Sequence, residues 1–173
     1  MSEIVVRKLV DLPEVQSQID DIFFESSTKK EFKDQAEKEA FHWKYVGFYL
    51  KNFPELTLVA YADKLLGYIL GSPSTRREDL YLIQPHLSIF EDLFELFPAH
   101  LHINCHFEAR GLGIGGKLLE AFEAELKTAG VKGLHIMTGT ESLNRNFYIK
   151  HGFHFQEVRS FQGNPILFMG KNL

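Results

Sequence analysis

The sequence predicts one α/β domain, and three stretches carry that prediction. Residues 101–108 (LHINCHFE) alternate apolar and polar side chains, which is the period of a strand with one buried face. Residues 117–130 (KLLEAFEAELKTAG) repeat apolar side chains at helical spacing and end on a glycine. Residues 56–62 and 65–71 flank Asp63-Lys64, as expected of an antiparallel hairpin. The chain therefore combines strands and helices in one fold.

Composition limits the class of protein. The chain has 173 residues, of which 45% are hydrophobic and 13% aromatic, enough for a sizeable core and too many for a disordered chain. A net charge of −4 provides no general attraction to nucleic acid or to an anionic membrane, so we expect neither as a partner. Cys105 is the single cysteine, and neither a secretory signal nor a long apolar span is visible. We therefore expect a cytoplasmic protein.

The first half of the chain predicts a strand and two helices before the hairpin. Residues 4–10 (IVVRKLV) form the strand, and a helix follows to about Glu25, with Asp11 as its cap and Pro13 in its first turn. A second helical pattern runs from Lys30 to Phe53-Pro54. Its aromatic side chains fit either core packing or the wall of an acceptor pocket, and the sequence leaves both open: Phe41, Trp43, Tyr45, Phe48 and Tyr49.

The second half is less regular up to residue 98. Residues 72–77 have the composition of a loop, and residues 88–97 (SIFEDLFELF) predict a short amphipathic helix. Acidic residues of this region fit a solvated helix face or the attraction of a cationic substrate: Glu78, Asp79, Glu91, Asp92 and Glu95. Beyond residue 130 we expect a strand at 133–137, a helix at 141–151, and strands at 153–158 and 166–170 around a turn at 162–165.

A glycine-rich loop, ARGLGIGG at residues 109–116, joins the predicted strand to the predicted helix. Residues without a β-carbon let backbone N–H groups approach a ligand at the positive end of a helix. We therefore predict that this loop binds phosphate groups.

Two other phosphate-binding classes fit less well. Gly111, Gly113 and Gly116 spell G-x-G-x-x-G, the fingerprint of dinucleotide-binding domains. However, Ala109 and Arg110 separate the glycines from the strand, no acid that would bind a ribose follows near Gly133, and fewer than sixty residues remain for the other strands. A nucleoside triphosphate loop needs Gly-Lys-Ser or Gly-Lys-Thr, which the chain lacks.

Two motifs in order resemble the GNAT family of N-acetyltransferases. The run Arg110-x-x-Gly113-x-Gly115 resembles the loop with which that family binds the pyrophosphate of an acyl-coenzyme A, and residues 147–153 (FYIKHGF) resemble its F-Y-x-x-x-G-F segment. The resemblance implies a single acyltransferase domain over residues 1–173, with a mixed, mostly antiparallel sheet of about six or seven strands. It also implies a splay at the centre of the sheet and about four or five flanking helices. Residues 98–103 (PAHLHI) resemble the branch related to the acetyltransferase-like domain of O-GlcNAcases.

The resemblance implies direct transfer of an acetyl group from acetyl-CoA to an amine within a ternary complex. Backbone N–H groups of the loop would hold the pyrophosphate, with Arg110 adding charge or bracing it: Gly111, Leu112, Gly113, Ile114, Gly115 and Gly116. The backbone of Ile103, Asn104 and Cys105 would pair with the pantetheine arm, and an N–H near Cys105 would polarise the thioester carbonyl. Tyr148 would protonate the leaving thiolate, because a phenol is a workable acid at neutral pH.

Some positions depart from the family pattern. Glu141 stands where the family often has an asparagine that contacts pantetheine, and Asn144 is the nearer substitute. Asn104 stands where the O-GlcNAcase-like branch often has an acid. Because of these differences, a domain that binds acyl-CoA without turnover, a sensor or interaction module, is the alternative reading.

The chemistry also requires a base. An amine with a pKa near about 10.4 needs about 4 to 5 kcal/mol to lose a proton at neutral pH. His102, His106 and Glu108 can accept a proton and share one face of the predicted strand, and the sequence does not choose among them.

Two further chemistries fit the sequence less well. The thiol of Cys105 suggests a nucleophile that carries an acyl group, but its place on the apolar face favours a small hydrophobic side chain. A His-x-His spacing without further ligands does not indicate a metal. The expected acceptor is a small-molecule amine or a peptide or protein amine, and the expected assembly a monomer or homodimer.

Overall fold

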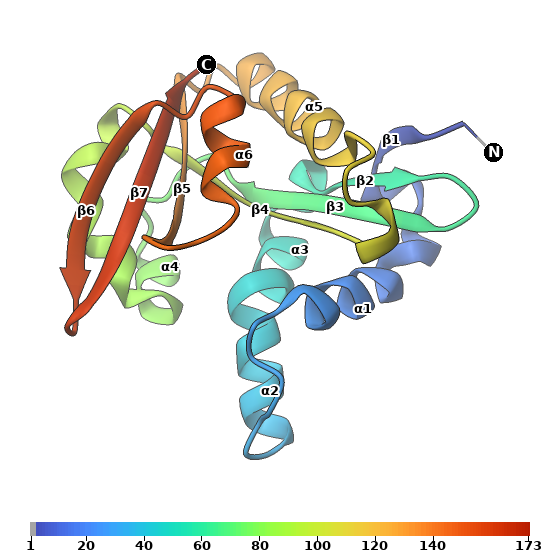
Figure 1. Ribbon diagram of the computed structural model, residues 1–173, viewed down its shortest axis with the longest axis horizontal. Helices are drawn as coiled ribbons and strands as arrows, with labels where there is room; N and C mark the ends of the chain where they lie inside the picture. Colours follow the sequence, from blue (N-terminus) through green and yellow to red (C-terminus); the bar gives the residue numbers. More distant parts are fainter. Residues whose placement is uncertain (1–2) are drawn as a thin grey trace. The chain divides into compact units, whose positions relative to one another are not determined.

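The computed structural model describes residues 3–173 and has an α/β fold with seven strands in one sheet, in the order β1-β2-β3-β4-β5-β7-β6 (Figure 1). The strand pairs are mostly antiparallel, and β4 and β5 are parallel. The described residues also form six α-helices. The predicted mixed sheet is confirmed. The number of helices is one above the upper end of the predicted range of four to five.

The described residues form two compact units. The first holds residues 3–71 and His102–Glu125, and the second holds Ser72–Leu101 and Leu126–Leu173. Strand β4 (Ala99–Cys105) and helix α5 (Ile114–Thr128) each contribute residues to both units.

The first unit contains the predicted hairpin. Strand β1 (Val5–Lys8) pairs antiparallel with β2 (Leu58–Tyr61), which pairs antiparallel with β3 (Leu65–Ser72). A shift of register between Ala60 and Tyr61 puts a bulge next to the turn of the hairpin. Strand β1 is shorter than the predicted 4–10, because Leu9–Asp11 turn into a 3₁₀ helix.

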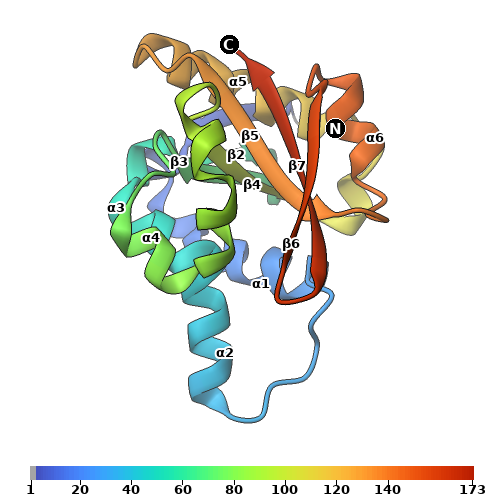
Figure 2. The same ribbon diagram turned by 90° about the vertical axis from the view of Figure 1, so that its left-hand side faces the viewer.

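The helices of the first unit are α1 (Gln16–Ser26), α2 (Gln35–His42), α3 (Phe48–Asn52) and most of α5. Helix α1 buries Ile19, Ile22 and Phe23, as its spacing predicts, but Asp11 makes no cap there: Val15 is the N-cap, without a side-chain bond. Helix α5 matches its prediction, except that Glu123, expected on the polar face, is buried. In Figures 1 and 2, α2 projects away from strands β2 and β3 of its unit.

The second predicted helix starts later and changes its pitch. It begins at Gln35 instead of Lys30, where the side chain of Asp34 accepts a hydrogen bond from the N–H of Glu37 (2.8 Å). A π-helix, Trp43–Gly47, then separates α2 from α3. The sequence pattern showed the helical run but not this insertion.

The second unit is built on β5 (Gly133–Gly139), β6 (Phe155–Phe161) and β7 (Asn164–Asn172), which lie side by side (Figure 2). Strand β4 enters the unit with Ala99 and His100, which pair in parallel with Leu134 and His135. Helix α4 (Glu78–Ile83) was not predicted. Most of the amphipathic segment predicted at 88–97 belongs to a kinked 3₁₀ helix, Pro85–Glu95. Helix α6 (Arg145–Lys150) is shorter than predicted.

Core packing in the second unit explains where glycine is required. A Cβ built on Gly133 would lie 2.0 Å from the carbonyl oxygen of Leu96, so β5 can approach the preceding segment only without a side chain at this position. His135 of β5 is buried and stacks on Phe94 and Phe168, with ring centroids 5.1 and 4.6 Å away. Within residues 3–173, no helix is both long and apolar enough to cross a lipid bilayer.

Candidate functional site

The glycine loop lies between β4 and α5 in the first unit, as predicted. Strand β4 ends at Cys105, a 3₁₀ turn spans Phe107–Ala109, and α5 begins at Ile114. The strand is thus shorter than the alternation suggested, and Phe107, expected on the buried face, is 56% exposed. The turn takes over because the N–H of Ala109 bonds back to the carbonyl oxygen of His106 (2.9 Å).

Two glycines of the loop have backbone angles that other residues rarely adopt. Gly111 has φ = 81° and Gly113 has φ = 76°, and a Cβ built on either would meet no atom within 4 Å. The space in front of the loop is therefore open, and Ile114 anchors the start of α5 with its buried side chain.

The start of α5 offers hydrogen-bond donors to a ligand. The first N–H groups of an α-helix have no acceptor within the helix, and the helix dipole places positive potential there. Leu112 is 61% exposed, and Arg110 reaches across to the hydroxyl of Ser26 (3.5 Å). The loop thus has the open space, the donors and the charge that a phosphate group requires.

The last residues of β4 precede this loop and contact β3. The N–H of His106 donates to the carbonyl oxygen of Leu66 (2.9 Å), and the amide of Asn104 donates to the hydroxyl of Tyr68 (2.9 Å). A Cβ on Gly67 would lie 3.0 Å from the Asn104 carbonyl oxygen and from the Cys105 sulfur, so glycine allows this close approach.

The thiol of Cys105 is partly buried. Desolvation raises its pKa, and the nearby charge of Arg110 offsets only part of this effect. A raised pKa leaves less thiolate at neutral pH, which argues against a nucleophile at this position.

Glu108 lies on the exposed turn after β4. Its carboxylate binds the ammonium group of Lys64 at 2.5 Å, and this hydrogen bond lowers the pKa of Glu108. The sequence did not reveal this pair, because Lys64 belongs to the turn of the hairpin. A carboxylate with a lowered pKa is a weaker proton acceptor.

Asn144 and Tyr148 belong to the second unit. The side-chain oxygen of Asn144 accepts hydrogen bonds from the hydroxyls of Thr138 (3.2 Å) and Ser142 (2.7 Å), which holds the connection between β5 and α6. Tyr148 of α6 is 5% exposed and packs edge-on against Phe153, with ring centroids 5.3 Å apart.

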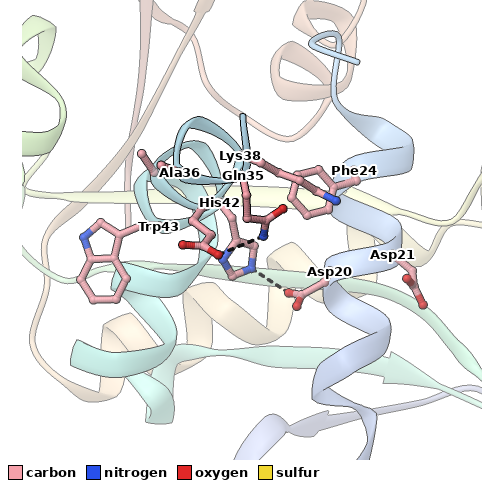
Figure 3. Close-up of a pocket in the computed structure, with 10 residues that line it drawn as sticks. Asp20, Asp21, Phe24, Gln35, Ala36, Lys38, His42 and Trp43 are labelled. Carbon is pink, nitrogen blue, oxygen red and sulfur yellow. Dashed lines mark hydrogen bonds and ion pairs between the residues drawn. The ribbon is translucent and has the colours of Figure 1, made fainter. Parts of the chain in front are cut away.

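The aromatic helix predicted from the sequence has buried rings, and one of its rings lines a pocket. Tyr49 is fully buried and Trp43 is 38% exposed. A pocket of about 790 Å³ lies between α1 and α2, with Trp43 and Phe24 among its aromatic walls. Figure 3 shows His42 pointing from α2 toward Asp20 on α1, where Nε2 and Oδ1 are 2.7 Å apart.

The lining of this pocket carries more negative than positive charge. Asp20, Asp21 and Glu39 contribute carboxylates, against the ammonium group of Lys38. Such a lining attracts cations.

The acidic residues of the second unit have another explanation. Asp79 binds Arg77 and Asp92 binds Arg159, at 2.6 and 2.5 Å, and Glu91 lies 3.6 Å from Arg76. These contacts indicate structural ion pairs at three of the five positions that the sequence offered as an attraction for a cationic substrate. Within residues 3–173, no group of three or more His, Cys, Asp or Glu side chains is arranged to hold a metal ion.

A strand, a glycine loop and a helix follow one another here in an α/β domain, an arrangement that can bind phosphate groups. Residues 54–155 match the family model for the acetyltransferase (GNAT) domain. The chain therefore belongs to the GNAT family. The narrower resemblance to the O-GlcNAcase branch stays a prediction.

Similar solved structures share this fold over their whole length. They include SsHAT, with a TM-score of 0.77 and 20% identity over 98% of both chains. A PaiA N-acetyltransferase from Thermoplasma acidophilum, in complex with coenzyme A, has a TM-score of 0.63 and 19% identity over 99% of both. A polyamine N-acetyltransferase of Drosophila melanogaster has a TM-score of 0.64 and 13% identity, over 99% of this chain and 100% of that one.

Proposed function

We propose that the protein is an N-acetyltransferase that moves an acetyl group from acetyl-CoA directly to an amine in a ternary complex. The observation that carries the proposal is the loop with left-handed Gly111 and Gly113 between β4 and α5. It offers open backbone donors to a pyrophosphate, and it lies within the stretch that matches the acetyltransferase domain.

In this proposal the backbone from Gly111 to Gly116 holds the pyrophosphate and Arg110 adds positive charge. The backbone of Ile103, Asn104 and Cys105 pairs with the pantetheine arm, and the N–H near Cys105 stabilises the developing oxyanion. Tyr148 donates its phenol proton to the leaving thiolate, and Asn144 contacts the donor. All of these roles come from the family resemblance.

A direct transfer is preferred to an acyl-enzyme on Cys105. Burial raises the pKa of this thiol, so little of it is thiolate at neutral pH. The amine therefore attacks the thioester itself, and both substrates are bound at once.

The acceptor is an amine whose identity the proposal leaves to experiment. Among the similar structures, one enzyme forms N-acetylagmatine and another complex holds a Gag peptide together with CoA. A test panel should therefore contain polyamines, agmatine, peptides with free N-termini and lysine-containing peptides. We also propose that residues 1–173 act as one domain in the cytoplasm, as a monomer or homodimer, which light scattering and cell fractionation can test.

The second candidate function is a module that binds acyl-CoA without turnover. Asn104 favours it, because its amide is bonded to Tyr68 and cannot accept a proton from a substrate. Release of the CoA thiol across the amine panel separates the two functions. Turnover that Tyr148→Phe reduces by a factor of about 100 supports the enzyme. Tight binding of acetyl-CoA with no release for any amine rejects it.

A further inference from the structure

The imidazole of His102 on β4 lies against two tyrosines of the first unit. Its Nε2 is 3.1 Å from the hydroxyl of Tyr49, and the two ring centroids are 5.1 Å apart at 64°. The ring of Tyr45 stands edge-on to the same imidazole, at 5.6 Å and 86°. Tyr49 is fully buried, whereas His102 is only partly buried. The buried hydroxyl therefore holds an imidazole that remains partly exposed to solvent.

A local departure from α-helical geometry brings these tyrosines to His102. Tyr45 lies in the π-helix Trp43–Gly47, and Tyr49 follows in the first turn of α3. A π-helical turn inserts one residue into the helix and rotates the residues after it by about 100°. Such insertions are uncommon and occur frequently at functional sites. The π-helix thus sets the direction in which Tyr49 meets His102.

The helix also depends on glycine at this point. A Cβ on Gly47 would lie 2.9 Å from Cε3 of Trp43, closer than side-chain contacts allow. A larger residue would therefore disturb the segment that places both tyrosines.

The other two proton acceptors that the sequence offers follow β4 in the chain and are less suited to act as a base. Glu108 is engaged by Lys64, which lowers the pKa of its carboxyl group. His106 lies at the turn, where its Nδ1 accepts from the N–H of Glu108 (3.4 Å) and its ring packs on Phe107.

We propose that His102 is the general base that removes a proton from the acceptor amine, with Tyr49 as its positioning residue. This inference rests on the proposed acetyl transfer and deepens it. In the tautomer required, Nε2–H donates to the Tyr49 oxygen and Nδ1 takes the proton. The hydrogen bond to Tyr49 persists when the ring is protonated, so it also stabilises the imidazolium.

The protons and electron pairs balance in this scheme. His102 takes one proton from the ammonium group, and the nitrogen lone pair forms a C–N bond with the thioester carbonyl carbon. The C–S bond breaks with its electron pair on sulfur, and Tyr148 gives its proton to that thiolate. The second proton on nitrogen replaces the one lost by Tyr148, and His102 releases the first to solvent. A base is needed because only about one amine in two thousand is neutral at pH 7.

The groups around His102 allow its titration to be recognised. The phenols of Tyr45 and Tyr49 face it from the helical run, and Tyr68 of β3 reaches the same strand through Asn104. Burial raises the pKa of Tyr68, and phenols in general titrate near about pH 10, well above imidazole. NMR of the His102 ring nitrogens therefore separates protonation of this imidazole from protonation of the phenols around it.

The first test compares His102→Gln with His154→Gln, a control that removes an exposed histidine of the second unit. Calorimetry measures the Kd of acetyl-CoA, and thiol release measures kcat from pH 5.5 to 9.5 with the most active amine. We expect His102→Gln to keep the Kd within twofold and to lose about 100-fold to 1000-fold in kcat at pH 7. Its remaining rate should rise tenfold per pH unit, without the plateau of the wild type and of the control.

The second test does not depend on turnover. Tyr49→Phe keeps the buried ring and removes the hydroxyl that binds Nε2. We expect the pKa of His102, followed by NMR of its ring nitrogens, to fall, because the imidazolium loses an acceptor. The acid limb of the pH profile of kcat, in which the rate rises with pH, should move to lower pH by the same amount. A tyrosine that only packs would leave both unchanged.

The outcomes separate this inference from the proposed function. If the wild type binds no acetyl-CoA, or binds it and acetylates no amine, the transferase proposal fails and the inference fails with it. If the wild type is active and His102→Gln keeps its rate and its acid limb, only the inference fails. If His106→Gln or Glu108→Gln loses the acid limb of the pH profile instead, the base is that residue, and the role of His102 is overturned. An NMR titration in which His102 takes up no proton between pH 5 and 9 would also overturn it.

Discussion

Replacement of Gly113 by alanine separates backbone strain from ligand binding at the proposed pyrophosphate loop. Gly113 has φ = 76°, and a Cβ there meets no atom within 4 Å, so alanine adds no clash in the free protein. The cost is the left-handed backbone itself, about 1–2 kcal/mol for a residue with a side chain. In a domain of this size that corresponds to a fall in Tm of about 2–8 °C.

Gly163 is the matched control for this strain. It lies in the turn between β6 and β7 with φ = 82°, and its Cβ would also meet no atom within 4 Å. Gly163→Ala should therefore lose about the same stability as Gly113→Ala. The control differs in that nothing in the proposal assigns its turn to the acetyl donor.

Binding of acetyl-CoA should distinguish the two variants. The methyl group of Gly113→Ala points into the space that a pyrophosphate would enter, and a lost hydrogen bond to a charged group costs about 1.5–3 kcal/mol. We expect its Kd, measured by calorimetry, to rise about 10-fold to 100-fold, while that of Gly163→Ala stays at the wild-type value. Ligand stabilisation in thermal unfolding should fall in parallel. Equal affinity of both variants, at equal loss of Tm, would refute the assignment of the loop.

Further predictions address other parts of the chain. Cys105→Ala should retain acetyl transfer. Iodoacetamide should label the thiol of the native protein more slowly at pH 8 than that of the unfolded protein, because burial raises the pKa of this thiol. Loss of all turnover in Cys105→Ala would instead support an acyl-enzyme on this residue. Asp34→Ala removes the N-cap of α2 and should lower the free energy of unfolding by about 1 kcal/mol in a urea titration. Hydrogen bonds from Lys29 and from the N–H of Lys33 lower the pKa of Glu37, so its contribution to stability is present above its unfolded pKa and is lost as the pH falls through the folded pKa. Glu37→Gln should therefore flatten the pH dependence of unfolding below about pH 4.5, and an unchanged slope would contradict this. Phe122→Ala empties a fully buried position of α5 and should cost about 3–5 kcal/mol in the same titration.

The sequence predicted the regular elements best where the pattern is local and strong. Helix α5 and the hairpin of β2 and β3 match their expected positions, because amphipathic spacing and alternation reflect which side of each element is buried. The prediction was wrong where backbone hydrogen bonds changed type, at Leu9–Asp11, Trp43–Gly47 and Phe107–Ala109. A 3₁₀ or π turn alters the number of residues per turn without changing the apolar pattern of the flanking sequence, so nothing in that pattern announces it.

Some features of the candidate site were also visible in the sequence, and others were not. The glycine loop was visible because residues 111–116 are contiguous and because left-handed positions such as Gly111 and Gly113 need glycine. The pairing of Glu108 with Lys64 was not visible in the sequence. This ion pair lowers the pKa of the Glu108 carboxyl group, which makes it a weaker proton acceptor than the residue type alone suggests.

By itself, therefore, the sequence determined an α/β protein with a glycine-rich loop at the front of a helix, because these features depend on residues close together in the chain. Only the tertiary structure decided how the side chains of β4 differ in chemistry. His102 meets the hydroxyl of Tyr49 across 53 positions of sequence, and Asn104 meets Tyr68 across 36. The protonation and orientation of a side chain depend on neighbours brought together by folding, and a local pattern carries no record of them.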